Sequence, residues 1–136
     1  AEWPALTAAL AADHSEDALA ELRAVLAEQY RLTFRYRRPL LLLTKCALEF
    51  PGLADVFVAG LRDRLLDLLA GYLSRRARAG LLRTVPDFHA AAALMVQAIA
   101  WSALQRPHDP GMTALSDEVA ETATLDLLVH GMRPLS

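Results

Sequence analysis

Apolar residues recur at steps of three and four along the segment that follows Asp17, and this spacing restricts the chain to a helical fold. Leu22, Leu26 and Tyr30 fall on one side of a helix, while charged residues fill the other sides. No segment alternates apolar and polar residues at period two for long enough to form a sheet. We therefore predict an all-α fold.

Proline and glycine residues divide the chain into about six helices. The run Ser15-Glu16-Asp17 offers a hydroxyl cap and two acids at the start of the first long helix, and Pro39 is suited to be the first residue of the next one. Asp87 and Ser116 are typical of the starts of the last two helices. The expected helices cover residues 3–12, the stretch from the Ser15–Asp17 cap to 38, 39–50, 54–78, 88–105 and 116–131.

The length and composition predict a single domain that has more apolar surface than its own core needs. The chain has 136 residues, which is enough to bury its own core. Its hydrophobic fraction of 54% and mean hydropathy of +0.24 exceed the globular average, so some apolar surface is expected to form a subunit interface or an internal pocket. The formal net charge of -2 predicts no general attraction to nucleic-acid phosphates.

The expected location is the cytoplasm. Cys46 is the single cysteine, so no internal disulfide is possible and a reducing compartment fits. The chain begins without an initiator Met or a leader pattern, and we interpret it as a fragment of a protein that is not secreted. The apolar tract 90–104 is shorter than the roughly 20 residues of a membrane span and contains Gln97, so it is expected to form a buried helix.

No pattern of residues predicts catalysis. The four histidines fall in different segments, without the spacing of metal ligands, and neither a GxSxG motif nor a phosphate-binding glycine loop is present. Cys46 has only Lys45 as a local activating group. We therefore predict a protein that is not an enzyme and uses neither a metal nor a cofactor.

The order of segments resembles the regulatory domain of TetR-family transcriptional regulators. The corner between two helices and the short apolar helix after it are carried by FRYRRPLLLLTKCALEFPGLADVF. A long helix that exits through glycine is carried by GLRDRLLDLLAGYLSRRARAGLL. The alanine-rich penultimate helix is TVPDFHAAAALMVQAIAWSAL, and the closing helix is SDEVAETATLDLLVHGM.

This resemblance implies a homodimer in which the last two helices pair with their copies in a four-helix bundle. The residues support the same arrangement, because helix 88–105 is apolar nearly all round and its alanines allow another helix to approach closely. The alternative is that this helix is wholly buried within one subunit. The expected interface residues are Ala91, Leu94, Ala98, Ala103, Val119, Ala123 and Leu127.

The resemblance also implies a mainly apolar cavity for a small effector. The candidate lining residues are Tyr30, Thr33, Phe34, Cys46, Phe57, Tyr72, Met95, Gln97 and Trp101. Gln97 is the strongest candidate, because it interrupts an apolar face and a buried amide needs a partner. Aromatic and Met side chains at helical spacing are also typical of a plain core, and Gln97 could instead bond across the dimer axis.

The function implied is that of an effector-binding and dimerisation domain of a transcriptional repressor. Contact with DNA would be made only by a separate N-terminal helix-turn-helix, which this chain does not contain. The alternatives are a stand-alone helical carrier of small molecules and a structural adaptor, neither of them catalytic.

Overall fold

The computed structural model describes residues 3–50, 52 and 60–135, and within them every regular element is helical. The predicted all-α fold is confirmed. The α-helices are α1 (Pro4–Ala11), α2 (Ala18–Arg35), α3 (Arg37–Glu49), α5 (Gly60–Arg78), α6 (Phe88–Ala100) and α7 (Asp117–His130). A π-helical turn, η2 (Trp101–Gln105), continues α6, and the 3-10 turns η3 (Arg106–His108) and η4 (Pro110–Met112) lead towards α7.

Short polar side chains define three helix starts. Asp17 Oδ1 accepts from Ala20 N at 3.0 Å, and Asp87 Oδ1 accepts from Ala90 N at the same distance. Ser116 Oγ accepts from Val119 N at 3.3 Å. These bonds satisfy backbone N–H groups that lack a partner in the first helical turn. The cap of α2 is therefore the carboxylate of Asp17, whereas the sequence offered the Ser15 hydroxyl.

The corner between α2 and α3 lies earlier than predicted. Helix α2 ends at Arg35, Tyr36 is the shared cap residue, and α3 begins at Arg37. Pro39 therefore occupies the third position of α3, where its missing N–H costs nothing because the first turn has no intrahelical acceptor for it.

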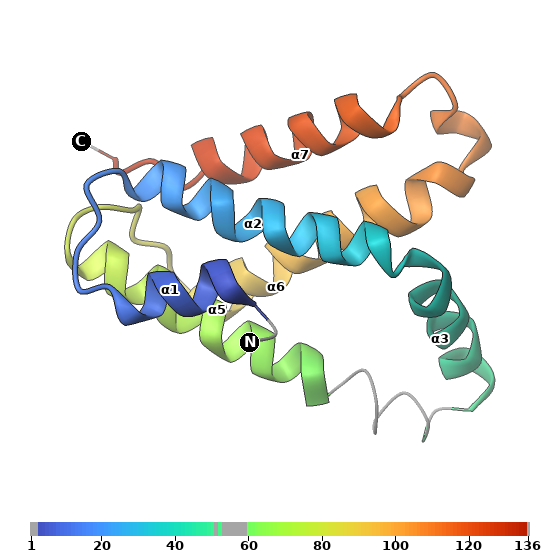
Figure 1. The fold of residues 1–136 in the computed structure, drawn as a ribbon, viewed down its shortest axis with the longest axis horizontal. Coiled ribbons are helices and arrows are strands. Elements are labelled where there is room, and N and C mark those ends of the chain that lie inside the picture. Colours follow the sequence, from blue (N-terminus) through green and yellow to red (C-terminus); the bar gives the residue numbers. More distant parts are fainter. Residues whose placement is uncertain (1–2, 51, 53–59, 136) are drawn as a thin grey trace.

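Helix α2 runs through the middle of the molecule and packs on α1, α6 and α7, while α5 packs along α6 (Figure 1). Helices α6 and α7 run antiparallel and are joined through η2 and the 3-10 turns at one end. At the other end, Arg83 N donates to Met132 O at 2.8 Å and ties the segment after α5 to the end of α7. The core is continuous, with Leu22, Leu73 and Ile99 fully buried.

The helical run Phe88–His108 is only partly buried, which corrects the expectation of a buried helix. It has 21 residues and is long and apolar enough to cross a membrane by length and composition alone. Only 39% of its apolar window is buried within the chain, and Leu94, Gln97 and Trp101 are exposed along it. An apolar helix exposed to this extent needs a partner or an apolar medium.

Candidate functional site

Two rows of apolar side chains lie exposed on α6–η2 and on α7. Leu94 and Trp101 are seven residues apart, and Val119, Ala123 and Leu127 are four apart, so each row follows one face of its helix. The four large side chains are between 41% and 78% exposed. We call these five residues the outer rows. Contiguous patches of exposed apolar side chains are typical of interaction surfaces.

The other predicted interface residues are placed differently from one another. Ala91 and Ala98 are half-buried beside the α6 row. Ala103 is fully buried within the chain, so its assignment to the interface is wrong for this conformation. The physical reason is spacing: nine residues separate Ala103 from Leu94, which is two and a half helical turns and so points to the opposite side.

Gln97 is exposed, which corrects the prediction of a buried amide in the pocket. It lies on the outward side of α6, between Leu94 and Trp101. An exposed amide is satisfied by water and needs no protein partner. The proposal that it bonds across a dimer axis remains a prediction.

A chain of three hydroxyl groups lies under η2 and joins three helices. Tyr30 Oη on α2 is 2.8 Å from Ser102 Oγ on η2, Thr124 Oγ1 on α7 is 3.1 Å from Ser102 Oγ, and Thr124 also donates to Ala120 O at 2.7 Å. Each hydroxyl carries one hydrogen, so the consistent direction runs from Tyr30 to Ser102 to Thr124 to the carbonyl. Tyr30 and Ser102 are both buried. The sequence analysis missed Ser102, because no local pattern predicts the π-helical turn that carries it.

None of the eight described residues of the predicted pocket lines the cavity under Trp3 or the groove between α2 and α7 that are described below. Tyr30, Thr33, Tyr72 and Met95 are buried, Phe34 and Cys46 are half-buried, Trp101 and Gln97 are exposed, and Phe57 lies outside the described residues. Tyr30 and Tyr72 use their hydroxyls in hydrogen bonds to Ser102 and Glu21. The buried members are therefore core residues in this conformation, as helical spacing alone also allowed.

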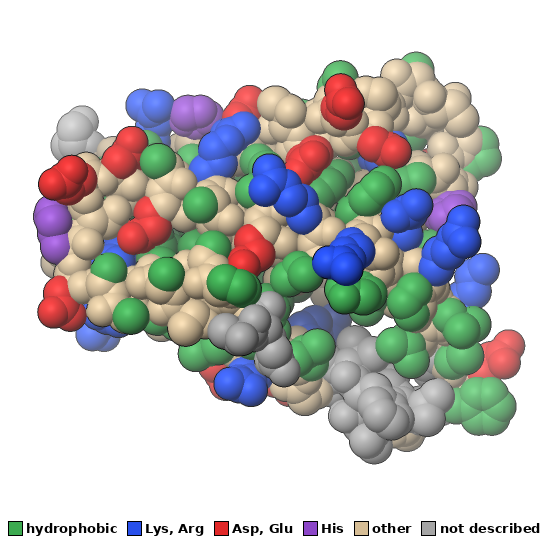
Figure 2. All heavy atoms as spheres, in the orientation of Figure 1, with side chains coloured by type: hydrophobic (Ala, Val, Ile, Leu, Met, Phe, Trp, Pro, Cys, Tyr) green, Lys and Arg blue, Asp and Glu red, His purple; other side chains and the backbone are tan. Residues whose placement is uncertain are grey.

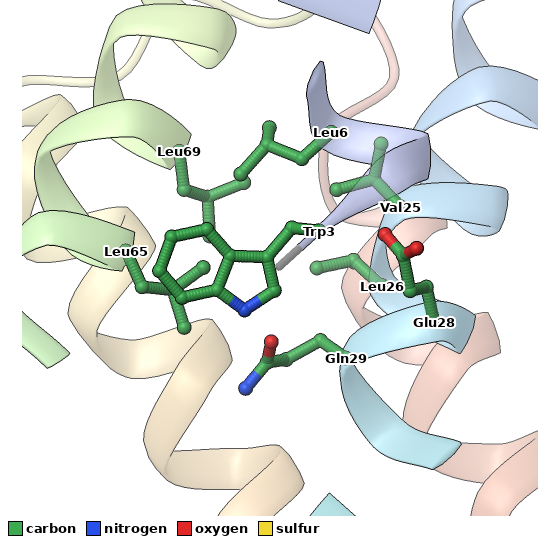
Figure 3. A pocket seen from close by; sticks show the side chains of 8 residues that line it. All are labelled: Trp3, Leu6, Val25, Leu26, Glu28, Gln29, Leu65 and Leu69. Carbon is green, nitrogen blue, oxygen red and sulfur yellow. The ribbon is translucent and has the colours of Figure 1, made fainter. Parts of the chain in front are cut away.

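A small cavity lies instead between α1, α2 and α5, under the indole of Trp3 (Figure 3). Its volume is about 10 Å³ and it is partly open to solvent. Four of its eight lining residues are leucines, and two are polar residues of α2. The lining residues are Trp3, Leu6, Val25, Leu26, Glu28, Gln29, Leu65 and Leu69.

The two polar residues at this cavity differ in how their side chains are satisfied. Both carboxylate oxygens of Glu28 accept from Ala5 N, at 3.1 and 3.0 Å, and so anchor the start of α1. The buried amide oxygen of Gln29 has no hydrogen-bond partner within the described chain. Gln29 follows Leu22 and Leu26 at seven and three residues, on the apolar face of α2. A glutamine on an otherwise apolar helix face is therefore the sequence feature that could have indicated this cavity.

A buried arginine holds the end of α1 against α5. The Arg76 side chain is almost fully buried, and its Nη2 donates to Ala9 O at 2.8 Å and to Ala12 O at 3.1 Å. Arg75 donates to Leu10 O at 2.6 Å. These carbonyls end α1 without intrahelical partners, so the two guanidinium groups act as its C-terminal cap.

Glu21 and Tyr72 complete this arginine cluster. Burial acts to raise the pKa of Glu21, but the hydrogen bonds from Arg76 and Tyr72 and the charge of Arg76 together lower it below its ordinary value of 4.5. Burial and the acceptor Glu21 raise the pKa of Tyr72. The hydrogen bond to Glu21 raises the pKa of Arg76 against the effect of burial. The cluster is fully paired, which is the arrangement expected of a structural clamp.

An open groove of about 520 Å³ runs between α2 and α7. Both basic and acidic side chains lie on this face of the molecule (Figure 2). Arg23 and Asp126 form a hydrogen-bonded ion pair at 2.6 Å, and Arg31 lies 3.9 Å from Glu121. These ion pairs connect the two helices across the groove, and each is exposed enough to contribute little to stability.

The described residues contain no group of three or more His, Cys, Asp or Glu side chains that could hold a metal ion. Comparison with known proteins gives no further assignment: no family model, no curated protein and no solved structure matches this chain.

Proposed function

We propose that this chain is the regulatory domain of a TetR-like transcriptional repressor, which forms a homodimer through α6 and α7 and binds a small apolar effector. The observation that carries the proposal is the pair of outer rows, four large apolar side chains exposed on two consecutive antiparallel helices. The order of helices and the resemblance of their sequences to that family support it. The domain would act in the cytoplasm, without catalysis.

A second copy of the chain is the partner that fits these rows best. Burying one large aliphatic or aromatic side chain contributes about 1.5–3 kcal/mol. In a two-fold dimer, both copies would bury the same four side chains. Ala91 and Ala98 beside the α6 row, and Ala123 within the α7 row, leave room for close approach of helices. Two antiparallel helices from each copy would form a four-helix bundle.

The proposed mechanism uses the dimer to set the spacing of two DNA-binding units. A helix-turn-helix dimer reads half-sites about 34–36 Å apart, so a change in the dimer alters DNA binding. An effector must prefer one arrangement by about 5.5 kcal/mol to reverse a population from 1:99 to 99:1. The hydroxyl chain from Tyr30 through Ser102 to Thr124 links α2 to both helices of the proposed interface.

Native mass spectrometry and sedimentation velocity of the purified chain test the proposal. We expect a mass near twice 14.9 kDa. Leu127→Glu places two like charges near the proposed axis and should give a monomer that keeps its helical circular dichroism. Leu42→Glu is the matched control, because Leu42 is similarly exposed but lies on α3, and this variant should remain dimeric.

A wild-type chain that stays monomeric at the highest soluble concentration would contradict the proposal. The same holds if Leu127→Glu leaves the dimer intact, because the interface would then lie elsewhere.

A further inference from the structure

Three polar side chains line the cavity under Trp3: the indole of Trp3, the amide of Gln29 and the carboxylate of Glu28, which is already bonded to Ala5 N. Leu65 and Leu69 of α5 face it from one side and Gln29 of α2 from the other (Figure 3). The amide nitrogen of Gln29 donates to Thr33 Oγ1 at 3.5 Å, which leaves the amide oxygen directed into the cavity. That oxygen is buried and has no donor within the described chain.

The indole nitrogen of Trp3 is the complementary atom. The Trp3 side chain is buried, and the Gln29 amide oxygen points towards the indole nitrogen in Figure 3. No hydrogen bond joins the two groups in the part of the chain that the structure describes. An indole N–H is a donor only, and an amide oxygen is an acceptor only. A group that satisfies both atoms from within the cavity must therefore accept from the indole and donate to the amide oxygen.

We propose that this cavity is a recognition site for the hydroxyl group of a small apolar alcohol or phenol, an inference that rests on the proposed function as an effector-binding domain. A hydroxyl oxygen accepts from Trp3 Nε1–H and its hydrogen is donated to Gln29 Oε1. The cavity of about 10 Å³ matches one group of that size. The apolar remainder of the molecule lies in the open part of the cavity, against its leucine rim.

Other ligand chemistries satisfy this pair of atoms less well. An ether or ketone accepts from the indole but leaves the amide oxygen of Gln29 without a donor, which is costly for a buried group. A carboxylate also lacks a donor and would be desolvated as an ion among leucines. The site therefore discriminates by the presence of one hydroxyl hydrogen, and this discrimination is large when the rejected ligand leaves a buried group unpaired.

The test is an NMR titration of the full ¹⁵N-labelled chain with three probes of similar size: phenol, anisole and toluene. The chain has two tryptophans, and Trp101→Phe assigns their indole N–H signals. We expect phenol to shift the Trp3 indole signal in a saturable way and to leave the Trp101 signal in place. Anisole and toluene should bind at least about tenfold more weakly, because each leaves the Gln29 oxygen unsatisfied.

Gln29→Leu keeps the apolar shape and removes the acceptor. In this variant the affinity for phenol should fall to that for anisole, while the affinity for anisole stays unchanged. Gln105→Leu is the control, because Gln105 is an exposed glutamine of η2 that is distant from the cavity in sequence and helix. It should bind phenol as the wild type does.

Equal affinities for phenol, anisole and toluene would overturn the inference, as would a phenol shift confined to Trp101. A long-lived water seen by its nuclear Overhauser effect to the Trp3 indole N–H, and retained at saturating phenol, would identify the site as a water site only and overturn it too. Measuring whether each sample is a monomer or a dimer distinguishes failure of this inference from failure of the proposed dimer. A dimer that fails to bind phenol contradicts this inference alone, whereas a monomer that binds it contradicts the proposed dimer alone.

Discussion

The guanidinium of Arg76 and the carboxylate of Glu21 form a paired contact across α5 and α2, with Nε donating to Oε1 at 2.8 Å and Nη2 to Oε2 at 3.3 Å. The Arg76 side chain is almost fully buried and that of Glu21 mostly so. Because Arg76 also caps the end of α1, this single side chain joins three helices. Its removal would leave two carbonyls without their donor and the Glu21 carboxylate with Tyr72 as a donor but without its positively charged partner.

Arg76→Met should destabilise the chain by about 3–5 kcal/mol, since it breaks a buried ion pair and leaves Glu21 uncompensated. Arg75→Met is the matched control, because Arg75 is adjacent, also donates to α1, and has a side chain that is 42% exposed. Its loss should cost less than about 1 kcal/mol. Urea unfolding followed by circular dichroism measures both. Equal losses for the two variants would show that burial of the pair is not what matters.

The same pair predicts how stability depends on pH. The pKa of Glu21 is lowered in the folded chain from its ordinary value of 4.5. The ionised carboxylate therefore contributes stability at pH values above 4.5, and this contribution is lost as the pH falls from 4.5 through the lower folded-state pKa. Urea unfolding between pH 3 and pH 7 should show a decline on the acid side. In Glu21→Gln that decline should be smaller, with lower stability at neutral pH, and an unchanged pH profile would contradict the assignment.

In the chain of hydroxyl groups, loss of the middle one, that of Ser102, is expected to lower the free energy of unfolding most. Ser102→Ala leaves the buried Tyr30 hydroxyl without an acceptor and should cost about 1–3 kcal/mol. Tyr30→Phe removes the donor at the end, so Ser102 can still donate to Thr124, and the cost should be about 1 kcal/mol. The double variant should cost less than the sum of the two, because the residues share one bond. Additive losses in urea unfolding would show that the hydroxyl groups are not coupled.

The starts of the last two helices were predictable because their signals are local. Asp87 and Ser116 cap the last two helices as expected, since a cap requires only a short polar side chain and the three residues after it. The positions of Gln29 and Arg76 carried a usable signal as well. Each is a polar residue at a position where its helix is otherwise apolar, as Leu26 and Tyr72 show on the same faces.

The site itself was less predictable, because it depends on packing between distant segments. The apolar spacing that selected Tyr72 and Met95 marks a buried face, but it carries no information on whether neighbouring side chains leave a void beside it. Ala103 was grouped with Leu94 by composition, although their spacing places them on opposite sides of one helix. The cavity under Trp3 needed three helices to be placed before it could be recognised.

Gly71 within α5 and Gly80 just after it are expected to respond in opposite ways to substitution by alanine. Gly80 has a φ of +76°, the left-handed conformation that ends α5, and Leu81 N donates back to Arg76 O at 2.9 Å. Gly71 lies within α5, and a Cβ added there meets no atom within 4 Å. A Cβ added at Gly80 also meets no atom within 4 Å, so steric crowding is absent at both positions. Backbone conformation alone therefore decides whether alanine raises or lowers the stability.

Gly80→Ala should therefore destabilise the chain by about 1–2 kcal/mol, because a Cβ is strained in the left-handed conformation. Gly71→Ala should stabilise it by about 0.5–1 kcal/mol, because alanine loses less backbone entropy on entering a helix. Urea midpoints compared at equal m-values measure both changes. If both substitutions raised the urea midpoint, residue 80 would adopt an ordinary helical conformation. The end of α5 would then not be fixed by Gly80, and the turn that carries Leu82 into the core would need another cause.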